Sequence, residues 1–164
     1  MTYRRFAAMI LVSTVVMYGL MFLNTYEVDH VRFSETRLYM ALIMGAVMAI
    51  IMMGFMWSMY EKTRINQAII ALSIVVFAGS LWLVRSQATP GDVAYMKAMI
   101  PHHSIAVLTS ERARIRDARV RELADEIIEA QVREIDEMNA LIADLSRDPP
   151  PSDAPALPPR AATP

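Results

Sequence analysis

The sequence has 164 residues, a formal net charge of -1 and no cysteine, and 55% of its residues are hydrophobic. The near-neutral charge argues against nucleic acid as a partner, and the absence of cysteine excludes disulfides, thiolate metal sites and cysteine nucleophiles. The apolar residues crowd into the first half of the chain, whereas most of the acidic residues follow Asp92. This distribution predicts an apolar part and a charged part rather than one evenly mixed domain.

Three uncharged segments predict membrane-spanning helices. They cover about residues 6–23, 38–59 and 67–84, and each is close to the roughly 20 apolar residues that cross a hydrocarbon core. The first segment follows two arginines, but it is longer than a signal-peptide core and has no cleavage site, so we expect it to be retained. Residues 1–85 are therefore predicted to form the membrane domain of an integral membrane protein.

The positive residues in the short loops predict the orientation of these spans. Arg4 and Arg5 precede the first span, and Lys62 and Arg64 lie between the second and third. Because lysine and arginine favour the cytoplasmic side, we expect a cytoplasmic N-terminus. For a bacterial inner membrane, everything after Arg85 would then lie on the periplasmic or extracellular side.

The second span carries two four-residue repeats. Ala41, Gly45 and Ala49 form the small-xxx-small pattern that lets membrane helices approach closely. A row of methionines runs beside them at positions 40, 44, 48, 52 and 56. This row either fills gaps at a helix contact or forms a thioether ladder for a soft metal ion. A four-residue repeat turns by about 40° per step around the helix, so it does not line one pore, and packing is the favoured interpretation.

Residues 92–146 are predicted to form an antiparallel helical hairpin. The first helix begins near Asp92 as a plausible N-cap and runs to about Ile115, with a kink expected at Pro101. Asp117 is suited to cap the second helix, whose apolar residues recur at helical spacing up to Leu145. The chain as a whole is therefore predicted to be all-α.

The segments on either side of the hairpin have the composition of a linker and a tail. Residues 86–91 form the linker, and residues 147–164 are rich in proline and alanine, which predicts disorder. A hairpin of this size is too small to bury a complete core by itself. We therefore expect it to form a four-helix bundle in a homodimer, or else to pack against the membrane domain.

The start of the hairpin has the side chains of a soft-metal site. Side chains three or four residues apart share a helix face, and antiparallel pairing about a turn near Asp117 brings a methionine of the second helix to the same level. The predicted ligands are Met96, Met99, His102, His103 and Met138. Thioethers and imidazoles suit Cu(I) or Ag(I), and zinc ranks lower, with Glu134 as the nearest acid. The alternative is a structural pair of histidines beside methionines that belong to the core.

Other sequence features give no further site. Glu27-Val28-Asp29-His30 contains a Glu-x-x-His motif, but a di-iron site needs two such motifs and two more glutamates, so we interpret this segment as a solvated loop. The chain has no nucleophile elbow, phosphate-binding loop or zinc-protease motif. The sequence therefore predicts neither an enzyme nor an organic cofactor.

The hairpin resembles a known family. The similarity rests on Tyr95-Met96-Lys97-Ala98-Met99-Ile100-Pro101-His102-His103 and on the later Gln131, Glu134-Ile135 and Met138. This pattern, over about residues 92–145, is similar to the domain of unknown function 305. The resemblance implies a ferritin-like helical half-bundle, an exported location and, for some members, copper binding through the methionines and histidines named above.

The leading hypothesis is a membrane-anchored protein that holds Cu(I) on the outer side for buffering, resistance or hand-off to a copper-handling partner. The first alternative is a membrane-tethered structural or interaction module whose hairpin dimerises or docks a partner. The second alternative is a metal-conducting membrane protein that uses the methionine row of the second span. We expect the membrane domain to lie in the lipid bilayer and the hairpin to lie on the aqueous side.

Overall fold

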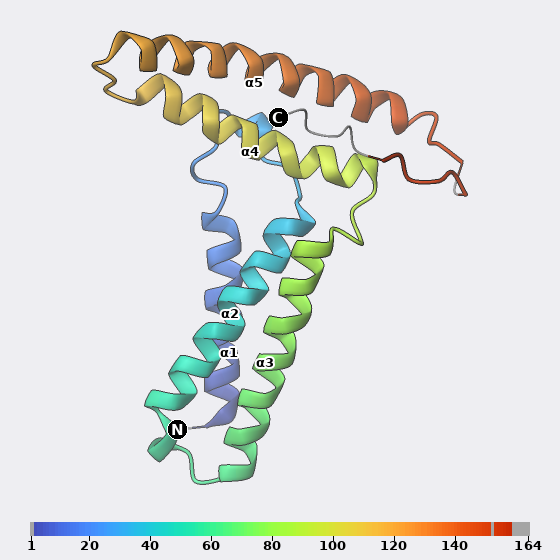
Figure 1. Ribbon diagram of the computed structural model, residues 1–164. Helices are drawn as coiled ribbons and strands as arrows, with labels where there is room; N and C mark the ends of the chain where they lie inside the picture. The colour runs from blue at the N-terminus through green and yellow to red at the C-terminus, as the bar shows by residue number, and fades with distance from the viewer. Residues whose placement is uncertain (1, 152, 159–164) are drawn as a thin grey trace.

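The computed structural model describes residues 2–151 and 153–158 and is all-α over these residues. Five α-helices follow one another in this part of the chain: α1 (Tyr3–Leu20), α2 (Glu35–Phe55), α3 (Thr63–Ser86), α4 (Asp92–Arg112) and α5 (Ala118–Leu145). Two short 3-10 turns, η1 (Val28–His30) and η2 (Trp57–Met59), lie in the connections on either side of α2. In Figure 1, α1, α2 and α3 form an upright bundle, and α4 and α5 lie side by side across its end.

Two of the three expected spans are supported by length and composition. Among the described residues, α2 and α3 are the helices long and apolar enough to cross a membrane. The first expected span, about residues 6–23, is not supported in that form. Its helix α1 is 18 residues long, includes Arg4 and Arg5 in its first turn, and ends at Leu20. The helix therefore starts on charged residues and stops short of the last apolar ones.

Small residues bring α1 and α2 together. Ala41 and Ala49 are buried, and so is Gly45. A Cβ atom on Gly45 would collide with the side chain of Thr14 in α1. The Thr14 hydroxyl also donates to the Ile10 carbonyl at 2.8 Å, which holds its rotamer. The predicted small-residue contact is therefore present, and its partner is α1.

A buried apolar cluster of the bundle lies near the N-terminus. Phe6, Ala49, Met53 and Tyr60 form a buried cluster. Met52 and Met56, from the methionine row of α2, pack against this cluster, whereas Met40 at the other end of the row is exposed. The row therefore winds from packed to exposed positions along the helix, as its four-residue repeat requires.

A buried amide ties the N-terminus to the α2–α3 connection. Asn66 is fully buried. Its side-chain oxygen accepts a 2.8 Å hydrogen bond from the Tyr3 hydroxyl, and its side-chain nitrogen donates to the Tyr60 carbonyl at 3.3 Å. Each polar atom of this buried side chain thus has a partner, which burial in an apolar bundle demands.

The hairpin has the predicted two helices with small shifts at their ends. Asp117 caps α5, since its Oδ1 accepts from the Arg119 amide at 2.9 Å. The first helix ends at Arg112 rather than Ile115, and its N-cap is Gly91, so Asp92 is its first residue. The helix continues through Pro101 without interruption.

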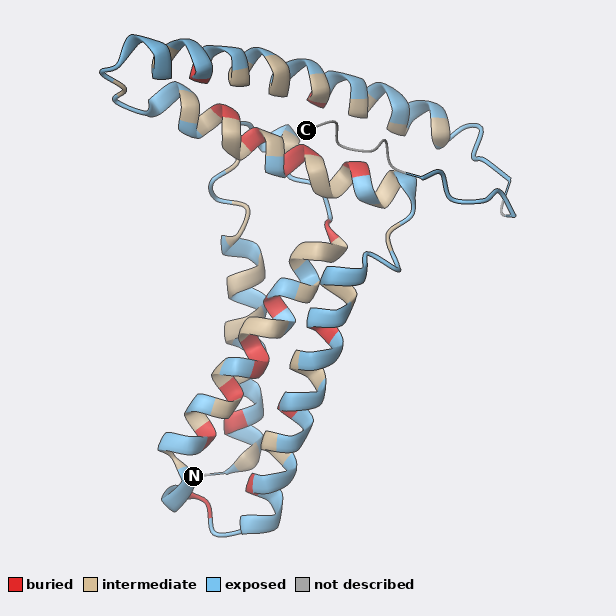
Figure 2. Cartoon of the chain, in the orientation of Figure 1, coloured by how far each residue is buried: buried red, intermediate tan, exposed pale blue. Residues whose placement is uncertain are grey.

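Helix α4 lies between α5 and the bundle. It packs along α5 and also contacts α2 and the turn η1. Figure 2 shows buried positions on α4 and largely exposed positions on the outer side of α5. Packing of the hairpin against the other helices, one of the two expected arrangements, is therefore seen within one chain.

Beyond α5, the described part of the tail has no further helix or strand. Residues 152 and 159–164 of the tail that we expect to be disordered lie outside the described residues.

Candidate metal site

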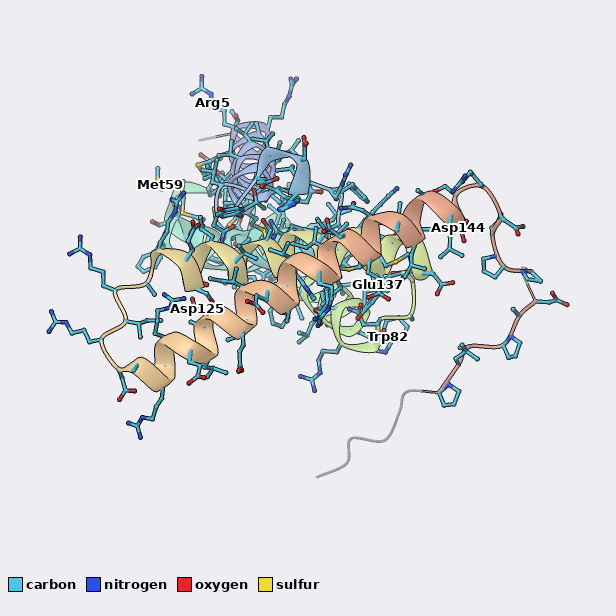
Figure 3. All side chains as sticks on the ribbon, turned by 90° about the horizontal axis from the view of Figure 1, so that it is seen from above. Arg5, Met59, Trp82, Asp125, Glu137 and Asp144 are labelled. Atoms are coloured by element: carbon cyan, nitrogen blue, oxygen red, sulfur yellow. The ribbon has the colours of Figure 1, made fainter. Side chains whose placement is uncertain are left out.

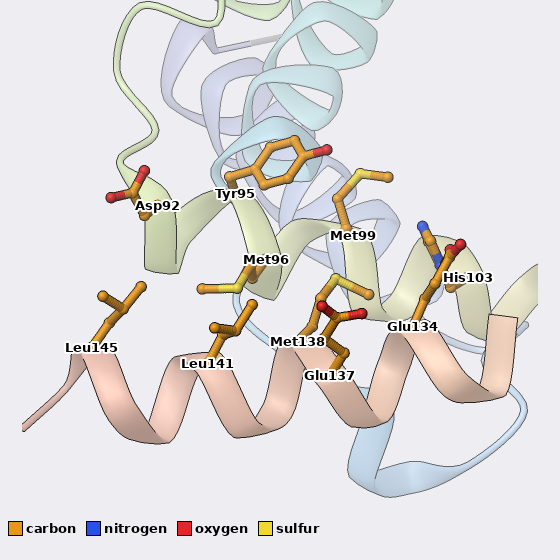
Figure 4. A pocket seen from close by; sticks show the side chains of 10 residues that line it. All are labelled: Asp92, Tyr95, Met96, Met99, His103, Glu134, Glu137, Met138, Leu141 and Leu145. Carbon is orange, nitrogen blue, oxygen red and sulfur yellow. The ribbon is translucent and has the colours of Figure 1, made fainter. Parts of the chain in front are cut away.

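Helices α4 and α5 enclose a groove of about 420 Å³ near the start of α4. Figure 4 shows its side chains: Met96 and Met138 lie between the two helices, and Met99 projects from α4 away from α5, beside Tyr95. His103 and Glu134 lie at one end and the leucines at the other. The groove is lined by Asp92, Tyr95, Met96, Met99, His103, Glu134, Glu137, Met138, Leu141 and Leu145. Its walls are mainly thioether and aliphatic groups, with a few acidic groups among them.

The structure brings together four of the five predicted ligands. Met96, Met99 and His103 from α4 and Met138 from α5 all line the groove. They share it because residues three, four or seven apart lie on one helix face, and because α5 runs antiparallel to α4. His103 contacts Glu134, which is close to the expected level near Gln131.

His102, the fifth predicted ligand, lies elsewhere. It is exposed and lines a separate cavity of about 430 Å³ with Ser34, Arg37 and Gln87, toward α2 and the end of α3. Successive residues on a helix point about 100° apart, and the two histidine rings are 6.1 Å apart between centroids. Met99 borders both cavities. The adjacent histidines therefore do not face one site together.

The His103 imidazole is held in a partly buried position. Its side chain is 13% exposed, and its Nδ1 lies 3.1 Å from Glu134 Oε2. The contact lacks the angle of a hydrogen bond, so this buried nitrogen has no hydrogen-bond partner among the described residues. Burial lowers the pKa of His103, the Glu134 carboxylate opposes that shift, and His102 adds slightly to it. The neutral ring, which is the form that ligates metals, is thus favoured.

The donors of the groove are of a soft kind. Met96, Met99, Met138 and His103 line the groove together with Asp92, Glu134 and Glu137. Within residues 2–151 and 153–158, no group of three or more histidine, aspartate or glutamate side chains is arranged to hold a metal ion. Thioether ligands are the kind that soft ions such as Cu(I) accept.

Sequence reasoning missed several residues of the groove. Asp92, Tyr95 and Glu137 were not among the predicted ligands, although helical spacing from Met96, Met99 and Glu134 could have found them. Leu141 follows Met138 by three residues on the same face. The predicted set held only residue types with a known affinity for metals, so the other residues on the same helix faces were left out.

The loop between α1 and α2 is also not a freely solvated segment. The Ser104 hydroxyl of α4 is fully buried. It accepts a 2.7 Å hydrogen bond from the Tyr26 amide and lies 2.9 Å from His30 Nδ1. The interpretation of Glu27–His30 as a solvated loop is therefore wrong for His30, which docks this loop onto the hairpin.

Comparison with known proteins identifies the hairpin. The family model described as Domain of unknown function (DUF305) matches residues 92–161, which confirms and extends the similarity expected for about residues 92–145. An uncharacterized protein of Acanthamoeba polyphaga mimivirus is 31% identical over 142 residues, which cover 82% of this chain and 91% of that protein. This match is too long to be confined to the hairpin, so it includes much of the chain before Asp92. No solved structure matches. The chain therefore belongs to the family that is defined by the Domain of unknown function (DUF305).

Proposed function

We propose that the protein is anchored in a membrane and holds a soft monovalent ion, Cu(I) or Ag(I), in the groove between α4 and α5. The observation that carries the proposal is that Met96, Met99 and Met138, from two helices, line one groove with His103, whose buried Nδ1 has no hydrogen-bond partner among the described residues. Thioether and imidazole ligands match the preference of Cu(I). Such a site would serve buffering, resistance or hand-off of copper to a partner protein.

The placement in a bilayer is part of this proposal. α2 and α3 have the length and composition of spans, and α1 runs beside α2 over the same depth (Figure 1). Three crossings would put the N-terminus and the α2–α3 connection on one side and the hairpin on the other. Arg4, Arg5, Lys62 and Arg64 then favour a cytoplasmic N-terminus, with the hairpin on the periplasmic or outer face.

The proposal is tested by anaerobic Cu(I) titration of the full-length protein in mild detergent against a competing chelator. We expect one tightly held ion per chain. His103→Gln should weaken binding strongly, whereas His102→Gln, the matched control on the neighbouring residue, should leave it nearly unchanged. Wild-type protein that remains folded but takes no Cu(I) from the chelator would overturn the metal-binding proposal. Equal losses in both variants would contradict the assignment of His103 alone.

A second candidate function is an interaction module without a metal. It is favoured by the apolar side chains that α5 leaves exposed, namely Val120, Leu123, Val132 and Leu141. A second copy of the hairpin could cover them and complete a four-helix bundle. Native mass spectrometry of the full chain discriminates the two candidates, because a metal-free dimer that ignores added Cu(I) fits only the interaction module.

A further inference from the structure

The three bundle helices leave an apolar groove of about 540 Å³. α2 packs extensively against α3 and also against α1, whereas α1 and α3 do not pack closely on one another. The gap between them is floored by Gly45, Ala46 and Ala49 of α2. Its walls are Tyr3, Phe6, Ala7, Ile10, Leu11 and Thr14 of α1, and Ile65, Ile69, Leu72, Ser73 and Val76 of α3.

The interior of this groove suits hydrocarbon. Apart from Tyr3, the polar side chains on its walls are Thr14 and Ser73, and both are already satisfied within their own helices. Thr14 donates to the Ile10 carbonyl and Ser73 donates to the Ile69 carbonyl, each at 2.8 Å. Neither hydroxyl therefore has a proton left to donate to a ligand, and a hydrated molecule would lose hydrogen bonds on entry.

One end of the groove is basic. Tyr3 and Ile65 line that end, and their neighbours Arg4, Arg5, Lys62 and Arg64 are all exposed. The Arg5 side chain projects away from the bundle in Figure 3. Glu61 is the acidic residue in this connection. Basic residues at the cytoplasmic mouth of a gap between membrane helices are suited to bind anionic lipid headgroups.

We infer that this groove binds an anionic phospholipid, with an acyl chain between α1 and α3 and the phosphate at the basic end. The inference rests on the proposed placement of α1–α3 in a bilayer, and it is independent of the metal site. The bound lipid would fill the space that the small residues of α2 leave open, and would add to the Tyr3–Asn66 hydrogen bond in joining α1 to α3.

The charge at the end of the groove favours an anionic lipid as its occupant. From Tyr3 to Thr14 the groove follows α1 for roughly 17 Å, at about 1.5 Å per residue, so an acyl chain can lie along its apolar walls while its headgroup meets the basic residues. A helix of a second copy is an alternative occupant, and native mass spectrometry separates the two because a second copy adds the mass of a whole chain.

The test uses the full-length protein in nanodiscs that contain equal amounts of phosphatidylglycerol and phosphatidylcholine. After gentle release into the gas phase, native mass spectrometry counts the lipids that stay bound. We expect retained phosphatidylglycerol in preference to phosphatidylcholine. Ala7→Trp, which fills the groove, should lose most of it. Ala8→Trp, an equally exposed change on the neighbouring residue that does not line the groove, should keep it.

A second pair of variants tests the binding of the lipid headgroup. Arg4→Gln combined with Arg64→Gln should abolish the preference for phosphatidylglycerol, whereas Arg85→Gln at the other end of α3 should preserve it. Equal loss in Ala7→Trp and Ala8→Trp, or no retained lipid in a chain that stays in carbonate-washed membranes, would overturn the lipid site. A chain that carbonate removes from membranes would instead overturn the proposed bilayer placement.

Discussion

The bundle and the hairpin are both helical, but they build their contacts in opposite ways. In the bundle, small residues of α2 such as Gly45 let α1 approach until Thr14 touches the backbone. In the hairpin, large side chains such as Ile100 of α4 and Ile135 of α5 are buried. The first kind of contact depends on the absence of side-chain volume, as in membrane interiors. The second depends on burying apolar volume away from water.

The largest effect is expected from removing volume in the hairpin. Ile100 is fully buried in α4, so Ile100→Ala should lower the free energy of unfolding by about 2–5 kcal/mol. Thermal unfolding of the full chain, followed by circular dichroism, measures the change. Val120→Ala is the control, because Val120 is half exposed, and it should shift stability by less than about 0.5 kcal/mol. Similar losses in the two variants would contradict a hairpin core centred on Ile100.

In the bundle, the corresponding prediction adds side-chain volume instead of removing it. Gly45→Ala adds a Cβ that collides with Thr14, and relief by rotation would break the hydrogen bond of Thr14 to Ile10. We expect a loss of about 1–3 kcal/mol from overpacking, measured as a lower thermal midpoint in detergent. The same change at Gly54 meets nothing within 4 Å and should be neutral or slightly stabilising. A stable Gly45→Ala protein would show that α1 is not held closely against α2.

A smaller loss of stability is expected at the junction between the bundle and the hairpin. Ser104→Ala removes the acceptor of the Tyr26 amide and the contact with His30. Because Tyr26 is exposed and water can replace the lost acceptor, we expect a cost of about 1 kcal/mol. Hydrogen exchange should report faster exchange of the Tyr26 amide, while amides in the middle of α5 stay protected. Unchanged exchange at Tyr26 would mean that the loop is not docked through Ser104.

The smallest effect concerns pH. Burial holds the pKa of His103 below its ordinary value of 6.5. In the metal-free protein the unfolded chain then binds a proton more readily than the folded one just below pH 6.5. Stability should therefore fall as the pH drops from 6.5 toward the lowered pKa, and level off once folded His103 is also protonated. Subtracting the same titration of His103→Gln isolates this contribution from His30 and His102; identical curves would contradict the burial of the ring.

The sequence predicted the helices well where charge or periodicity marked them. The uncharged runs located α2 and α3 within a few residues, and Asp117 marked the start of α5 because a carboxylate caps exposed amides. The first span was predicted too far along the chain, since hydropathy could not show that the helix begins at Tyr3 and ends at Leu20. Helix ends depend on local turns that composition does not encode.

The candidate site was predicted in part for a related reason. Spacing alone placed Met96, Met99, His103 and Met138 together, but it could not separate His103 from His102. α4 has neighbours on two sides. Helical spacing therefore cannot tell which of these two sides a polar residue of α4 faces. The docking of Tyr26 and His30 on Ser104 joins residues more than 70 positions apart, and the apolar groove of the bundle is formed by three helices. Neither feature has a local signal.

The central claim is that the groove between α4 and α5 offers thioether sulfur to a soft ion. X-ray absorption at the copper edge of the full-length protein loaded with one Cu(I) tests it most directly. We predict sulfur and imidazole nitrogen around the copper, with the sulfur signal lost when Met96, Met99 and Met138 are all changed to leucine, a nearly volume-conserving replacement. A copper environment of nitrogen and oxygen alone, unaltered by these three substitutions, would contradict the account.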